Sequence, residues 1–371
     1  MHKITYLVTI LVAALFPFVV LIILFIFGMT LEGAVDGILF YVTPDFDKLK
    51  HIDVWSAAAN QIFYSLGPAF GGLITLSSYN RFDNNCHRDA ILIAFINCGT
   101  SIFAGFVVFS ILGFMAWSAG KSVEDVITSG PGLAFIAYPD AVSEMPVPQL
   151  WSFLFFFMLI LLGLDSMFTF VETLTTAIMD HFNHLHKYKH YVVIGICFIG
   201  FLSGLSMCTH AGIYMFELLD NTCASWNILL FAILELVVVS WIYGVRRFMK
   251  NIEEMDIHIP WPMKCYWMAC WTIVTPVLLI SLIVISFIRW EPLSSLDYKT
   301  FQGEEKLYTW PESIQVLGWL VPFSSVAFLP VLAIHQITSY YKKNGKLSFE
   351  LFKPTAEWKS VEDKKIEIRF G

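Results

Sequence analysis

The sequence predicts an all-α polytopic membrane protein. Its 371 residues are 57% hydrophobic and only 14% charged, and the mean hydropathy is +0.67. A soluble globule of this length needs more polar side chains to cover its surface. The apolar residues also gather into eight runs of about 20 residues or more, which is the length that a helix needs to cross the hydrocarbon layer.

The eight apolar runs define the predicted transmembrane domain, which covers residues 1–341. The first run is too long for the apolar region of a signal peptide, so we interpret it as a span. A charged tail, residues 342–371, follows the last run. The predicted spans lie near residues 5–29, 54–79, 89–119, 149–179, 190–209, 213–245, 264–288 and 314–341.

Lysine and arginine are concentrated in alternate connections between these spans. Because cytoplasmic loops carry an excess of both residues, these connections are predicted to be cytoplasmic, and so are both termini of the chain. The basic residues are Arg81 and Arg88, then Lys187 and Lys189, then Arg246, Arg247 and Lys250, and finally Lys342 and Lys343.

Several functional classes are not expected from the composition. The formal charge of −7 argues against a nucleic-acid partner. The seven cysteines show no CxxC pair and no His/Cys ligand spacing, so we expect buried free thiols and no metal centre of that kind. The connections contain no nucleophile or phosphate-binding motif, so the chain is not expected to be an enzyme.

Asp165 is an acidic residue in the middle of a predicted span. A carboxylate there costs about 2.5–3.5 kcal/mol on insertion scales, so an intramembrane acid is a candidate functional residue. Helical spacing places Asp165 on one face with Thr169, Glu172 and Thr176. The alternative is a structural polar seam between helices, which we favour for Glu172.

Two pairs of neutral polar residues also share a helical face. Gln61 and Ser65 lie four residues apart in the second run, and Asn97 and Ser101 lie four apart in the third. Hydroxyls and amides can replace the hydration shell of a small ion. Hydrogen bonding between helices is the alternative, and spacing alone favours it.

The stretch FYSLGPAFGGLITLSSYN interrupts the second run with helix breakers. Gly67, Pro68, Gly71 and Gly72 lie at its middle. A broken helix frees backbone groups, which is tolerated inside a membrane only where protein, ions or a ligand satisfy them. A discontinuous span therefore indicates a transporter binding site, and a simple proline kink is the alternative.

Four long motifs of the chain are similar to successive signatures of the sodium- and chloride-dependent neurotransmitter symporters. They are QIFYSLGPAFGGLITLSSYNRFDNNCHRDA, GPGLAFIAYPDAV, LLGLDSMFTFVETLTTAIMDHF and VVVSWIYGVRRF. The resemblance extends over nearly the whole chain and is strongest to the glycine and amino-acid branch.

The resemblance implies a twelve-helix fold with two inverted five-helix repeats, in which the first and sixth helices are broken around a central site. The eight runs correspond to helices five to twelve of that fold. The equivalent of helices one to four is then expected to be absent, so the ion and substrate sites are expected to be incomplete. Transport by this chain alone is not expected on that interpretation.

The resemblance also implies site residues. Sodium and chloride are expected as co-transported ions, with no other cofactor. Sodium ligands are expected at Ser65, Asn97, Leu162, Asp165 and Ser166, and chloride ligands at Gln61, Ser65, Asn97 and Ser101. Substrate contacts are expected at Tyr64, Ser65, Phe70, Ser166, Met167 and Phe170, and gating groups at Tyr79, Asp180 and Asp220.

The function predicted from the resemblance is sodium- and chloride-coupled symport of a small amino acid or related neurotransmitter at the plasma membrane. Met167 and Phe170 would narrow the substrate pocket, which favours glycine or another compact substrate. The alternatives are a non-transporting membrane protein that associates with a full-length relative, and an ion channel. The expected partners are the small-molecule substrate, the lipid bilayer and a second copy or a full-length relative.

Overall fold

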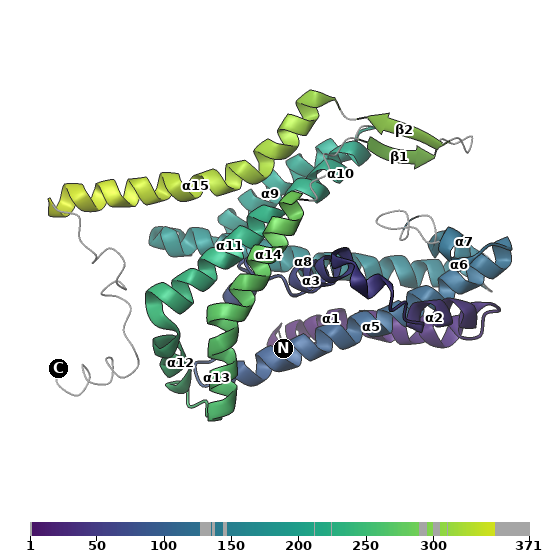
Figure 1. The fold of residues 1–371 in the computed structure, drawn as a ribbon, viewed down its shortest axis with the longest axis horizontal. Coiled ribbons are helices and arrows are strands. Elements are labelled where there is room, and N and C mark those ends of the chain that lie inside the picture. Colours follow the sequence, from purple (N-terminus) through teal and green to yellow (C-terminus); the bar gives the residue numbers. More distant parts are fainter. Residues whose placement is uncertain are drawn as a thin grey trace. The chain divides into compact units, whose positions relative to one another are not determined.

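The computed structural model describes residues 2–126, 135, 138–143, 147–210, 212–223, 225–288, 295–299, 305–309 and 311–345. The chain forms two compact units (Figure 1). The first unit comprises Met1–Trp55 and Arg88–Lys189, and the second comprises Ser56–His87 and His190–Gly371. Each unit is described by itself.

The first unit is built on three long helices, α1, α5 and α8. Its elements are α1 (His2–Gly28), α2 (Ala34–Val42), η1 (Lys48–Lys50), α5 (Cys86–Ala119), α6 (Val123–Val126), α7 (Tyr138–Ser143), α8 (Pro148–His181) and η3 (Asn183–Tyr188). The core of this unit contains Leu24 of α1, Ile111 of α5 and Phe155 of α8, which are at most 5% exposed. Van der Waals packing of these apolar side chains joins the three helices.

Glycines allow α1, α2 and α5 to approach closely. The backbone of Gly37 in α2 lies against that of Gly113 in α5, and a Cβ on Gly113 would lie 2.5 Å from the Gly33 carbonyl oxygen and 2.7 Å from the Gly37 nitrogen. A Cβ on Gly28 of α1 would lie 2.5 Å from the hydroxyl oxygen of Ser110 in α5. Small residues of this kind let helix backbones pack together in membranes, where the hydrophobic effect does not drive association.

The second unit contains the remaining helices and one hairpin. Its elements are most of α3 (Ile52–Leu66), α4 (Gly72–Ser78), α9 (Lys189–Met207), α10 (Gly212–Cys223), α11 (Trp226–Val237), α12 (Val245–Glu253), α13 (Trp261–Ala269), α14 (Thr275–Ile288), β1 (Ser295–Lys299), β2 (Glu305–Thr309) and α15 (Glu312–Asn344). Two π-helical stretches, Val238–Gly244 and Cys270–Val274, join α11 to α12 and α13 to α14. Leu229 and Ala232 of α11 pack against Leu279 and Leu282 of α14.

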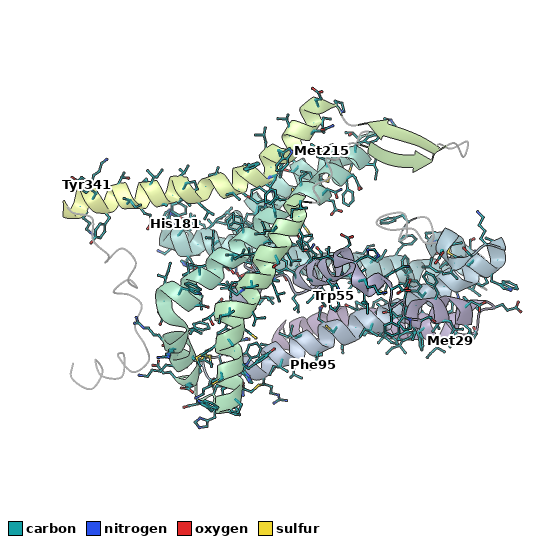
Figure 2. The ribbon with its side chains drawn as sticks, in the orientation of Figure 1. Met29, Trp55, Phe95, His181, Met215 and Tyr341 are labelled. Atoms are coloured by element: carbon teal, nitrogen blue, oxygen red, sulfur yellow. The ribbon has the colours of Figure 1, made fainter. Side chains whose placement is uncertain are left out.

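The predicted helical membrane architecture is confirmed in the described part of the chain. Six helical segments are long and apolar enough to cross a membrane, and Leu15–Gly28 is a shorter apolar segment. The second predicted span corresponds to the broken helix formed by α3 and α4, and the number of eight spans stays a prediction. Many of their apolar side chains face outward, such as Phe95 of α5, which is 75% exposed (Figure 2).

The structure adds detail to the sequence analysis at two places and corrects it at a third. The sixth run is divided, because α10 ends at Cys223 and α11 begins at Trp226. The connection 289–312 contains the antiparallel pair β1 and β2, with Ser295 opposite Thr309. The seven thiols are free, as predicted, but the prediction that they are buried is wrong, because five are exposed and two are intermediate.

Candidate functional site

The second predicted span is discontinuous in the structure. α3 ends at Leu66 and α4 begins at Gly72, and the segment between them contains three residues with positive φ: Gly67 at 63°, Ala69 at 64° and Gly71 at 78°. Such angles lie outside the right-handed helical region and are unusual for alanine. The helix is therefore interrupted over 67–71, which excludes the alternative of a simple proline kink.

Three of the predicted ligands lie on the last turns of α3, just before this break. Gln61 and Ser65 are exposed, and the half-buried Tyr64 donates its phenol hydrogen to the Ser225 carbonyl oxygen at 3.4 Å. Phe70 lies within the break, and Tyr79 at the end of α4 is exposed. These five residues belong to the second unit.

The predicted ligands on α5 form a pair in the first unit. The Ser101 hydroxyl donates to the Asn97 carbonyl oxygen at 3.0 Å, one helical turn earlier. The Asn97 side chain is half-buried and Ser101 is exposed. The helix thus keeps both polar side chains on the same face.

The predicted sodium ligands of α8 lie within one helical turn. The Ser166 hydroxyl donates to the Leu162 carbonyl oxygen at 3.3 Å, and the Asp165 carbonyl oxygen accepts the Thr169 hydroxyl at 3.2 Å. Asp165 is exposed, and among the described residues no cationic side chain pairs with its carboxylate. A carbonyl, a carboxylate and a hydroxyl are hard oxygen donors, which suit an alkali-metal cation.

The remaining predicted residues are exposed on α8 and α10. Met167 and Phe170 are 57% and 48% exposed on the same helix as Asp165. Asp180 lies near the end of α8, one residue before His181 (Figure 2). Asp220 lies on the last turn of α10, in the second unit. The predicted residues on α5 and α8 thus belong to the first unit, and those on α3 and α10, in the break and at the end of α4 belong to the second.

Glu172 has a structural partner. Its Oε1 lies 2.6 Å from Nζ of Lys189, the first residue of α9, and the two side chains are 29% and 41% exposed. This ion pair supports the structural interpretation of Glu172. Asp165, on the same helix, has no comparable contact among the described residues.

Replacement of Lys189 by methionine is expected to destabilise the chain by about 1 kcal/mol, because it leaves the half-buried Glu172 carboxylate without its ion-pair partner. Thermal unfolding in detergent measures this change. Glu172→Gln in the same background should recover most of the loss, since the double variant also removes the carboxylate charge that Lys189 neutralises. Equal stability of Lys189→Met and the unmodified chain would contradict this interpretation.

The sequence analysis did not identify a polar cluster around Asn227, near the start of α11. This side chain is 4% exposed and contacts both the end of α10 and α15. The signal in the sequence is an asparagine within the apolar run WNILLFAIL. One of its partners, Ser325, lies 98 positions away in the chain, so the cluster is not visible in the local sequence.

The described part of the chain thus has the architecture of an all-α polytopic membrane protein, and its second predicted span is a discontinuous helix. The family model described as the sodium:neurotransmitter symporter family matches residues 3–340. The chain belongs to this family, whose members are transporters and not enzymes.

Curated relatives agree with this assignment. The chain is 46% identical to the sodium- and chloride-dependent glycine transporter 1 of Xenopus laevis over 326 residues, which is 87% of the chain and 49% of the relative. It is 44% identical to the human sodium- and chloride-dependent neutral and basic amino acid transporter B(0+) over 93% of the chain and 53% of the relative. It is 43% identical to the human sodium- and chloride-dependent GABA transporter 2 over 87% of the chain and 52% of the relative. The chain spans about half the length of these relatives.

Proposed function

We propose that the chain acts in sodium- and chloride-coupled symport of a small amino acid by alternating access. The observation that carries this proposal is the break at 67–71, directly after the polar residues Gln61 and Ser65. Unwound backbone inside a membrane supplies carbonyl and N–H groups to ions and substrate. Family membership and the names of the relatives support the same function.

The proposed ion sites follow the family resemblance. One sodium ion would be held by the α8 group of Leu162, Asp165 and Ser166, where the carboxylate balances its charge. A second sodium ion would use Ser65 and Asn97. Chloride would be bound by neutral hydroxyls and amides from Gln61, Ser65, Asn97 and Ser101. In this proposal each site also needs ligands from sequence equivalent to the first four helices of the family.

The proposed substrate is compact and glycine-like. Tyr64, Phe70 and Ser166 would contact it, and the bulk of Met167 and Phe170 would limit its size. The relatives are named for different substrates, although their identities to this chain are nearly equal, at 46%, 44% and 43%. Overall similarity therefore does not select among them, and the proposal rests on side-chain volume. Tyr79, Asp180 and Asp220 are proposed as gating groups.

The proposed location is the plasma membrane, with both termini of this chain in the cytoplasm. The alternating arrangement of basic connections supports this orientation. Labelling of cysteines introduced at the ends of the chain, in intact and permeabilised cells, tests it. Labelling of either end in intact cells would contradict the proposed orientation.

Uptake measurements test the function directly. Cells expressing the longest transcript that contains this sequence should accumulate radiolabelled glycine in preference to proline, GABA and betaine. Uptake should fall to background when sodium is replaced by choline, and should fall strongly when chloride is replaced by gluconate. Uptake that is unaffected by sodium replacement would overturn the coupling proposal.

The same experiment distinguishes the main alternatives. Absence of uptake, together with co-purification of this chain with a full-length relative, would instead support a non-transporting associated protein. Substrate-independent conductance that persists in Asp165→Ala would support an ion channel.

A further inference from the structure

A buried amide closes the interruption between α10 and α11. Asn227 is 4% exposed, and its Nδ2 group donates to the Cys223 carbonyl oxygen and to the Ser325 hydroxyl, both at 3.1 Å. Its Oδ1 accepts the Ser225 backbone N–H at 3.0 Å and the Ser225 hydroxyl at 3.4 Å. Both donor hydrogens of the amide are therefore used, and its oxygen accepts the Ser225 N–H. The single hydrogen of the Ser225 hydroxyl is shared with the Thr222 carbonyl oxygen, which lies at 3.2 Å.

These bonds satisfy backbone groups that the interruption leaves exposed. A helix that ends inside a membrane leaves carbonyl groups without intrahelical partners, and the segment that follows leaves free N–H groups. Asn227 satisfies one group of each kind, the Cys223 carbonyl and the Ser225 N–H. The Ser325 hydroxyl donates to the Pro322 carbonyl oxygen at 2.7 Å, so it is oriented to accept from Asn227.

The same cluster reaches the broken helix through the Ser225 carbonyl. This oxygen accepts the Ile228 N–H at 3.3 Å and the Tyr64 hydroxyl at 3.4 Å. Tyr64 lies three residues before Gly67, where the backbone first enters the left-handed region. Hydrogen bonds therefore connect α15, the start of α11 and the end of α3 within the second unit.

We infer that Asn227 is a positioning residue, which fixes the Ser225 carbonyl so that this carbonyl holds the Tyr64 side chain in one position beside the break. A hydrogen bond at the phenol oxygen limits the swing of the side chain about its Cα–Cβ bond. Tyr64 therefore stays at a fixed place where it can meet a small ligand. The consequence for substrate affinity rests on the proposed function. The consequence for the local order of the break is independent of the proposed function.

Hydrogen exchange of the purified chain tests the positioning itself. In Asn227→Ala, amides of 61–72 and of 220–228 should exchange about threefold to tenfold faster, the range expected for the loss of one or two buried hydrogen bonds. Tyr64→Phe removes only the hydroxyl and should accelerate exchange in 61–72. The double variant should exchange in 61–72 no faster than Asn227→Ala, because both changes remove the same connection.

Ser325→Ala is the matched control. It removes the bond between Asn227 and α15 and leaves the contacts of Asn227 with Ser225 and Cys223. A general packing role of Asn227 would give the same acceleration in 61–72 with Ser325→Ala as with Asn227→Ala, and that result would overturn the inference. Unchanged exchange of 61–72 in Asn227→Ala would overturn it as well.

Uptake kinetics supply the functional readout. Asn227→Ala and Tyr64→Phe should each raise KM about threefold to tenfold, with an unchanged maximal rate per transporter at the cell surface. Their effects on KM should not add. Normal KM in both variants would overturn the inference. Absence of uptake in the unmodified protein would count against the proposed function alone, and the exchange measurements would still decide the positioning role.

Discussion

Replacement of Asp165 by asparagine is expected to raise the sodium concentration for half-maximal uptake by about thirtyfold or more. The carboxylate is the only formal negative charge among the proposed ligands of that sodium ion. In the proposed site the bound ion and the ligands around it would shield this exposed carboxylate from water, and truncating one partner of such a desolvated charge pair costs about 2–5 kcal/mol. At about 1.4 kcal/mol for each factor of ten, 2 kcal/mol already corresponds to about thirtyfold. Sodium-dependent uptake by the longest transcript carrying the change, corrected for the amount at the cell surface, measures the effect.

Glu172→Gln is the matched control for this experiment. It removes the same charge from the same helix, at a residue whose carboxylate is paired with Lys189. It should change stability and leave the sodium dependence of uptake unchanged. Identical sodium dependence in Asp165→Asn and the unmodified protein would exclude Asp165 as a sodium ligand.

Gly113→Ala is expected to destabilise the first unit by about 1–3 kcal/mol or more. The added methyl group would meet the Gly33 carbonyl oxygen at 2.5 Å and the backbone of Gly37 at 2.7 Å. Backbone atoms cannot move aside as a flexible side chain can, so α2 has to shift away from α5. Thermal unfolding in detergent and the fraction of protein that reaches the cell surface should both decrease.

Gly200→Ala in α9 provides the comparison. A Cβ at Gly200 would have no neighbour within 4 Å, and alanine is favoured over glycine inside a helix by about 0.5–1 kcal/mol. This variant should be as stable as the unmodified chain or slightly more stable. Equal stability of Gly113→Ala and Gly200→Ala would show that the packing of α2 against α5 does not depend on the absence of a side chain at Gly113.

The apolar runs predicted most of the helices, because a membrane span has to satisfy its backbone internally and needs a minimum length of apolar sequence. The break after Leu66 was also predictable, since glycine and proline disfavour the helix directly. The family resemblance, and not the spacing, assigned roles to Asp165 and Ser65. Spacing alone favoured hydrogen bonding between helices for the neutral pairs.

The interruption between α10 and α11 could not be predicted in the same way. The sequence NTCASWNILL has no proline or glycine, and an apolar run with one asparagine is compatible with a continuous helix. The interruption is stabilised by Asn227, whose amide bonds to Cys223 and Ser225 nearby and to Ser325 on a distant helix. A contact across 98 positions of the chain leaves no local signal. The two π-helical stretches carried no recognisable sequence signal either.

The left-handed backbone at Ala69 has a consequence for the ligand binding proposed at the break. Alanine at φ 64° occupies a small allowed region, and Pro68 before it has a fixed φ, so the segment samples fewer conformations than an all-glycine linker would. Less entropy remains to be lost when a ligand binds, and more of the contact energy is retained as affinity. The discontinuity in this helix is therefore preorganised, in contrast to a flexible hinge.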